Sequence, residues 1–88
     1  MATQTKSLLV VDDHPLFRAA LKQAARLAAP DYELVEAASL GEAKAKLRDG
    51  LEPALITLDL RMSDSDGLIG LLTLKAEAPA LPVIVVSA

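Results

Sequence analysis

Three aspartates and one serine each lie at or just after the end of a short apolar run, a position from which a side chain can act at the edge of a sheet. Asp12 and Asp13 follow the run 8–11, Asp59 follows 54–58, and Ser87 ends the run 82–87. Carboxylates that lie together repel one another unless a cation is held among them. Mg²⁺ takes such oxygen ligands together with waters and a phosphate oxygen. A carboxylate beside that ion can attack a phosphoryl group while the ion neutralises the developing charge.

The elements that must position these residues alternate along the chain. The segments 7–11, 32–37, 54–58 and 82–87 are short apolar runs with β-branched residues, typical of strands buried on both faces. The segments 15–29, 39–49 and 67–78 lie between these runs and are predicted to form helices. This β-α-β-α-β-α-β order predicts a parallel sheet with right-handed crossovers. Because ligands bind outside the carboxyl ends of parallel strands, we expect the three aspartates and Ser87 to converge there.

Local signals mark the helix ends. Pro15 suits a first helical turn, where its missing N–H costs nothing. Ser39 and Glu42 form a capping box, and Gly50 suits the position after a helix because it tolerates positive φ. In the first helix we expect Phe17, Leu21 and Ala24 to lie in the core.

Composition narrows the class of protein. The 88 residues suffice for one small domain, expected to span 1–88, and 52% of them are hydrophobic. A net charge of −3 with no basic stripe argues against direct nucleic-acid binding. The chain has no Cys, no visible signal-peptide pattern and no apolar run long enough to cross a bilayer. We expect a soluble, cytoplasmic protein with no membrane contact.

Three motifs resemble the receiver domain of two-component response regulators. The first is VVDDHPLFR at 10–18, the second is the loop DLRMSDSDGL at 59–68, and the third is VVSA at 85–88. They occur in the family's order and after the corresponding strands. The first motif is most similar to receivers that precede a helix-turn-helix DNA-binding domain.

The resemblance implies a fold, a cofactor and a role for each site residue. It implies a three-layer α/β, flavodoxin-like sheet in the order 2-1-3-4, and Asp59 as the phosphoacceptor. Asp13 and Asp59 would bind Mg²⁺ directly with the backbone carbonyl of Arg61, and Asp12 would act mostly through a water. Ser87 would donate its hydroxyl to the phosphoryl group and act as the switch. The implied partner is a sensor histidine kinase, and the implied output is transcription regulation in the parent protein.

The chain departs from the family pattern in two ways. Ser63 replaces a proline of the acceptor loop, which removes a fixed φ, and Asp64 adds a charge. The chain also ends after the fourth strand, before the fifth strand with its lysine and the last two helices of the family. We therefore expect 83–86 to be an edge strand that favours a homodimer.

Other interpretations of the same residues give different functions. A phosphorylation-independent interaction module, acting by dimerisation or partner binding, is the main alternative. A haloacid-dehalogenase-like phosphohydrolase is disfavoured because Arg61, Met62 and Ser63 separate Asp59 from the sequence DSDG at 64–67; we expect no enzyme. A calcium loop of the EF-hand type lacks acids at the required positions. His14 is expected to be an exposed residue at the start of a helix rather than a ligand.

Overall fold

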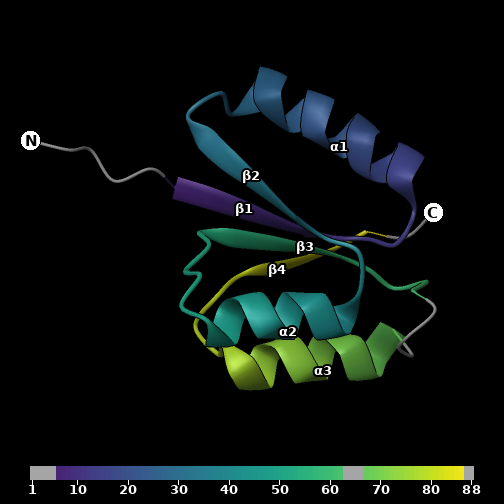
Figure 1. Ribbon diagram of the computed structural model, residues 1–88, viewed down its shortest axis with the longest axis vertical. Helices are drawn as coiled ribbons and strands as arrows, with labels where there is room; N and C mark the ends of the chain where they lie inside the picture. The colour runs from purple at the N-terminus through teal and green to yellow at the C-terminus, as the bar shows by residue number, and fades with distance from the viewer. Residues whose placement is uncertain (1–5, 63–66, 87–88) are drawn as a thin grey trace, which may run out of the picture.

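The computed structural model describes residues 6–62 and 67–86, which form a parallel sheet between two helical layers (Figure 1). The strands are β1 (Lys6–Val11), β2 (Tyr32–Ala37), β3 (Leu55–Asp59) and β4 (Val83–Val86). The helices are α1 (Pro15–Ala28), α2 (Leu40–Arg48) and α3 (Gly67–Glu77). The predicted element order is confirmed. Most bounds differ from the prediction by one or two residues, as expected where helix and strand ends fray.

The strands pair in the order β2-β1-β3-β4, and all pairs are parallel, which confirms the predicted three-layer sheet. Val11 at the end of β1 pairs with Leu58, and Asp59 at the end of β3 pairs with Val86. This register brings the residue after β1 level with Asp59. The strand order and register therefore suffice to bring the carboxyl ends of β1 and β3 together.

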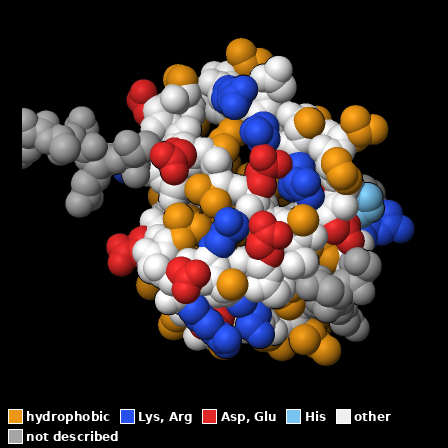
Figure 2. Space-filling model, viewed as in Figure 1, with side chains coloured by type: hydrophobic (Ala, Val, Ile, Leu, Met, Phe, Trp, Pro, Cys, Tyr) orange, Lys and Arg blue, Asp and Glu red, His pale blue; other side chains and the backbone are white. Residues whose placement is uncertain are grey.

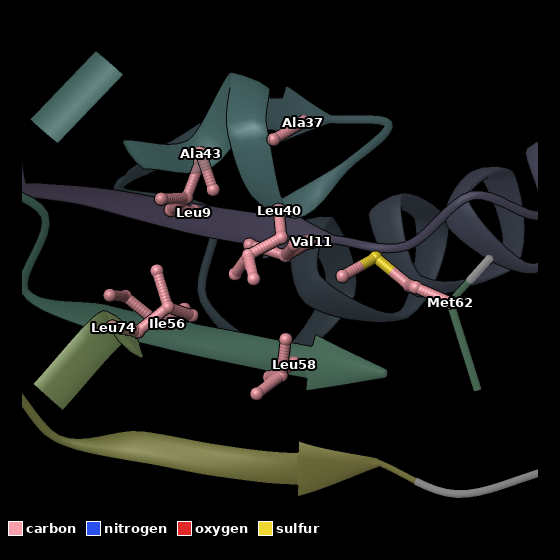
Figure 3. Close-up of a cluster of buried hydrophobic side chains, with 9 residues drawn as sticks. All are labelled: Leu9, Val11, Ala37, Leu40, Ala43, Ile56, Leu58, Met62 and Leu74. Carbon is pink, nitrogen blue, oxygen red and sulfur yellow. The ribbon is translucent and has the colours of Figure 1, made fainter. Parts of the chain in front are cut away.

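The hydrophobic core lies on the face of the sheet that α2 and α3 cover (Figure 3). Leu9 and Val11 of β1 alternate with residues that point to the opposite face, and Ile56 and Leu58 of β3 do the same. Ala37 of β2 also belongs to the cluster. The helices and the loop after β3 contribute the other four members: Leu40, Ala43, Met62 and Leu74. This packed layer holds the carboxyl ends of β1 and β3 in place.

Helix α1 covers the other face and packs less deeply (Figure 1). None of its residues is fully buried: Phe17 and Leu21 are partly buried, and Ala24 is exposed. The prediction that Ala24 lies in the core is therefore wrong. The physical reason is that α1 contacts the sheet mainly along β2, so only a narrow stripe of the helix meets other elements.

The predicted helix signals around α2 are confirmed with one difference. Ser39 Oγ accepts a hydrogen bond from the backbone N–H of Glu42 at 3.0 Å. The Glu42 carboxylate accepts from the backbone N–H of Ala38 at 3.2 Å, one residue before the cap. Gly50 has φ of 104°, a conformation that costs glycine little. These contacts fix where α2 starts and where the chain turns toward β3.

Acidic and basic side chains are interspersed on the face shown in Figure 2. The described residues also include two groups of ion pairs between side chains. Arg18 and Lys22 both bind Glu36, at 3.1 Å each, and Arg48 binds Glu77 at 2.6 Å. Within 6–62 and 67–86, none of the helices has the length and apolar character needed to span a membrane.

Candidate functional site

Three carboxylates meet at the carboxyl ends of β1 and β3, as predicted from the strand order. Asp12 and Asp13 follow β1, and Asp59 is the last residue of β3. The side chains of Asp12 and Asp59 are almost fully buried, at 1% and 4% exposed, and that of Asp13 is 22% exposed. One potential ligand atom from each of these residues and from His14 lies within 4.8 Å of the others. Such crowding of negative charge is costly unless a cation balances it.

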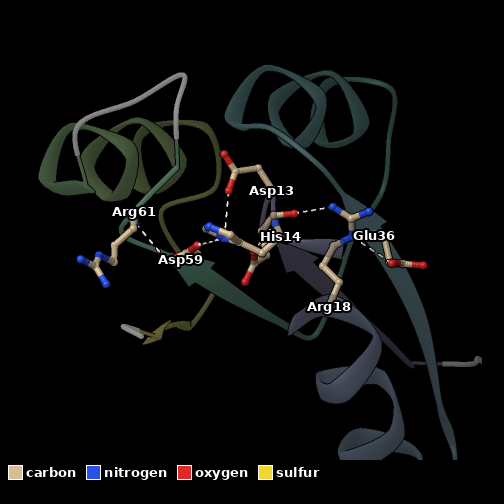
Figure 4. A network of polar contacts seen from close by, with 7 residues as sticks. Asp13, His14, Arg18, Glu36, Asp59 and Arg61 are labelled. Carbon is tan, nitrogen blue, oxygen red and sulfur yellow. Dashed lines mark hydrogen bonds and ion pairs between the residues drawn. The ribbon is translucent and has the colours of Figure 1, made fainter. Parts of the chain in front are cut away.

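His14 also belongs to this cluster (Figure 4). It is the N-cap of α1 and is 58% exposed, so the expected exposure at a helix start is confirmed. Its Nδ1, however, lies 3.0 Å from Asp12 Oδ1, 3.0 Å from Asp13 Oδ1 and 3.2 Å from Asp59 Oδ2. Sequence reasoning missed this contact because the ring's direction is set by tertiary neighbours. The only available signal was its position directly after two aspartates.

The carboxylates change the ionisation of the imidazole. The hydrogen bond to Asp12 is the largest cause of a raised His14 pKa, and the charge of Asp13 adds to it. Partial removal from water opposes the change. The ring therefore holds a proton more readily here than in water, which offsets part of the carboxylate repulsion.

The turn between β1 and α1 is held from two sides. On one side, Asp12 Oδ1 accepts the backbone N–H of His14 at 2.7 Å. On the other, Arg18 donates from a terminal guanidinium nitrogen to the backbone carbonyl of Asp12 at 2.6 Å and from Nε to Glu36 at 3.1 Å. Glu36 lies on β2, so the Arg18 bridge ties the turn to the neighbouring strand. The Asp12 backbone is thereby fixed relative to the sheet.

The donor set fits a hard divalent cation. Asp12 Oδ2 is buried and has no hydrogen-bond partner among the residues at 6–62 and 67–86. A buried carboxylate oxygen without a partner is costly, and a bound cation would satisfy it. Three carboxylates that supply oxygen from two strands are the kind of ligand set that Mg²⁺ accepts. The cluster of Asp12, Asp13 and Asp59 could therefore hold a metal ion.

The residues directly after β3 also contribute to the site. The backbone N–H of Arg61 donates to Asp59 Oδ1 at 2.9 Å, which orients the carboxylate. Arg61 and Asp59 line a depression of about 390 Å³ together with His14, Leu16 and Phe17. A small phosphorylated group has room to approach Asp59 there. That the Arg61 carbonyl ligates a metal stays a prediction, and Ser87, Ser63 and Asp64 lie outside the described residues.

Comparison with known proteins identifies the family. The family model described as "Response regulator receiver domain" matches residues 8–88. The chain belongs to the response regulator receiver family. Asp12, Asp13 and Asp59 all lie within the matched part.

Curated relatives agree with this membership. The chain is 42% identical over 81 residues to the glycerol metabolism activator of Pseudomonas putida, a match that covers 92% of this chain and 37% of that protein. It is 38% identical to the nitrate/nitrite response regulator protein NarL of Escherichia coli K12, with the same two coverages. This chain thus spans little more than a third of the length of these relatives.

Among solved structures, the response regulator TrrA of Thermotoga maritima in complex with Mg²⁺-BeF superposes with a TM-score of 0.83 at 30% identity. The match covers 94% of this chain and 70% of that one. The fold predicted from the strand order is therefore the receiver fold.

Proposed function

We propose that this receiver is a phosphorylation switch in which Asp59 accepts a phosphoryl group from a sensor histidine kinase. The observation that supports this most directly is the position of Asp59. It ends a central strand, its side chain is 4% exposed, and it lies beside Asp12 and Asp13 and lines a depression in the surface. Burying a carboxylate beside two others is energetically costly, and this arrangement is typical of a functional site.

The chemistry follows from the residues present. An oxygen of Asp59 attacks phosphorus, an O–P bond forms, and the P–N bond to the donor imidazole breaks. The departing imidazole nitrogen takes a proton. When bound, Mg²⁺ supplies positive charge to the transferring phosphoryl oxygens. Asp12, Asp13, Asp59 and the carbonyl of Arg61 would hold the ion, and Ser87 would donate to the product.

The family and its relatives support the output side of this proposal. NarL is described as a response regulator, and the glycerol protein as an activator. By analogy, we propose that the parent protein regulates transcription from the cytoplasm. The receiver would then supply the input, and a separate segment would bind nucleic acid.

Self-association through β4 is the second part of the proposal. β4 is the outermost strand of the described sheet on that side, and Ile84 and Val85 are 51% and 41% exposed. An apolar edge strand with unpaired backbone groups favours pairing with another strand. We propose a homodimer through this edge. Sedimentation should show a dimer that Ile84→Lys weakens, and a monomer at high concentration would contradict this.

Phosphoryl acceptance is tested by intact mass. The protein is incubated with acetyl phosphate, with Mg²⁺ or with EDTA, and the mass of each sample is compared. We expect a gain of one phosphoryl group in Mg²⁺ and none in EDTA or in Asp59→Asn. Asp31→Asn is the matched control because Asp31 is exposed and away from the site. An unchanged wild-type mass would favour the phosphorylation-independent interaction module.

A further inference from the structure

The Arg18 side chain connects the acidic site to the neighbouring strand β2. Arg18 lies in the first turn of α1, where its backbone N–H donates to the His14 carbonyl at 3.0 Å. Its guanidinium donates from Nη1 to the Asp12 carbonyl at 2.6 Å and from Nε to Glu36 at 3.1 Å (Figure 4). The side chain is 18% exposed, so most of it is removed from water. Two charge-assisted contacts of this kind hold their partners more firmly than neutral hydrogen bonds do.

Both backbone groups of Asp12 are thereby tied to β2. The Asp12 N–H donates directly to the Ala37 carbonyl at 3.0 Å. The Asp12 carbonyl is held through Arg18, whose other partner, Glu36, precedes Ala37 on β2. This carbonyl belongs to the peptide that joins Asp12 to Asp13, and a peptide unit is planar. Fixing its oxygen therefore also fixes the plane from which the Asp13 side chain departs.

We propose that Arg18 is a positioning residue for the metal at this site. By holding the peptide between Asp12 and Asp13, it keeps both carboxylates in the arrangement that a divalent ion needs, and Glu36 holds the guanidinium in place. This inference rests on the metal cluster of the proposed function. It adds residues that act on the cluster through the Asp12 backbone rather than as ligands.

The charge of Arg18 acts in the opposite direction to its positioning role. A positive side chain beside a cation site repels the ion, so the charge alone lowers the affinity for Mg²⁺. Arg18→Met removes this repulsion and, if charge were the only effect, would tighten Mg²⁺ binding. The same change releases the Asp12 carbonyl, and groups that orient metal ligands contribute about 10- to 100-fold to affinity. The direction in which Mg²⁺ affinity changes therefore separates positioning from charge.

Lys22 provides a matched control on the same helix. Its Nζ donates to the same Glu36 carboxylate, at 3.1 Å, from one turn further along α1. Of these two basic side chains, only Arg18 donates to Asp12 within residues 6–62 and 67–86. Lys22→Met thus removes one positive charge and one contact with Glu36 while the Asp12 carbonyl stays held.

Titration calorimetry with Mg²⁺ and no phosphodonor measures the affinity directly. We expect Arg18→Met to weaken Mg²⁺ binding about tenfold and Lys22→Met to change it less than about twofold. Arg18→Lys keeps the charge, but a single ammonium cannot reproduce the guanidinium fork, so we expect a loss of about threefold. Unchanged or tighter binding in Arg18→Met, or an equal loss in Lys22→Met, would overturn the proposal. If Arg18→Met fails to fold, Arg18→Lys decides, and an unchanged affinity in that variant would overturn it.

The Mg²⁺ dependence of phosphoryl acceptance separates positioning from a general loss of structure. With acetyl phosphate as donor, Arg18→Met should raise the half-saturating Mg²⁺ concentration about tenfold and lower the rate at saturating Mg²⁺ less than about twofold. A lower saturated rate with unchanged half-saturation would overturn the proposal.

The same samples separate this inference from the proposed function. A wild type that binds Mg²⁺ but is not modified by acetyl phosphate, together with weaker Mg²⁺ binding in Arg18→Met, would leave the positioning role standing and reject phosphoryl acceptance. Normal modification of the wild type, together with full Mg²⁺ affinity in Arg18→Met, would support phosphoryl acceptance and reject the positioning role.

Discussion

Removing the charge of Asp12 should stabilise the protein when no metal is present. The side chain is 1% exposed, and its cluster brings three carboxylates to within 4.8 Å of one another. At that separation and an effective dielectric constant of about 20, each pair of carboxylates repels by about 3.5 kcal/mol. The asparagine in Asp12→Asn keeps an oxygen that can accept the His14 N–H, so that hydrogen bond is retained.

The net gain is smaller than the repulsion of a single pair. The charge of Asp12 is also attracted to His14 and to the guanidinium of Arg18, whose donor lies 2.6 Å from the Asp12 carbonyl. These attractions are lost with the charge. We therefore expect Asp12→Asn to raise the free energy of unfolding in EDTA by about 1 to 2 kcal/mol. For a domain of this size the midpoint of thermal unfolding should rise by roughly 4 to 8 °C per kcal/mol.

Metal should reverse the order of stability. An ion at a hundred times its dissociation constant stabilises the wild type by about 2.7 kcal/mol, whereas the variant binds it weakly. Urea unfolding followed by circular dichroism, in EDTA and in Mg²⁺, measures both effects. Asp31→Asn, which makes the same charge change at an exposed site, is the control. An Asp12→Asn protein that is less stable than the wild type in EDTA would refute the reasoning, because Asp12 would then be a structural residue.

Two further predictions concern the scaffold. Hydrogen bonds from Lys22, the larger cause, and from Arg18 lower the pKa of Glu36 below its ordinary value of 4.5. The contribution of these contacts to stability is therefore present above pH 4.5 and is lost as the pH falls through the pKa of the folded protein. The stability difference between wild type and Glu36→Gln, from urea unfolding at several pH values, should therefore shrink in acid, and a difference independent of pH would contradict this. Ile56→Ala removes a fully buried side chain and should lower the free energy of unfolding by about 2 to 5 kcal/mol in the same assay. The control Leu27→Ala, at an 88% exposed site, should change it by less than about 0.5 kcal/mol. Similar losses for both variants would show that the core is misplaced.

The sequence was sufficient for the architecture because strand positions and topology determine where the chemistry lies. Asp12, Asp13 and Asp59 could be placed together before the structure was known, since the carboxyl ends of parallel strands share one edge. Ser39 and Gly50 likewise predicted the ends of α2 from local backbone requirements.

The side-chain directions that depend on tertiary contact could not be predicted in this way. Helical spacing placed Ala24 in the core, but spacing does not show how wide a stripe of α1 meets the sheet. His14 was expected at a helix start, and it lies there. Nothing in its position along the chain specifies that its ring turns back over three carboxylates, because that contact depends on where β3 brings Asp59.

The central claim is that Asp59 itself receives the phosphoryl group. Protein treated with acetyl phosphate and Mg²⁺ is reduced with borohydride, which converts an aspartyl phosphate to homoserine, and peptide mass spectrometry then locates the converted residue. We expect homoserine at position 59 and none at Asp12 or Asp13. Conversion at another aspartate, with Asp59 unmodified, would contradict the claim.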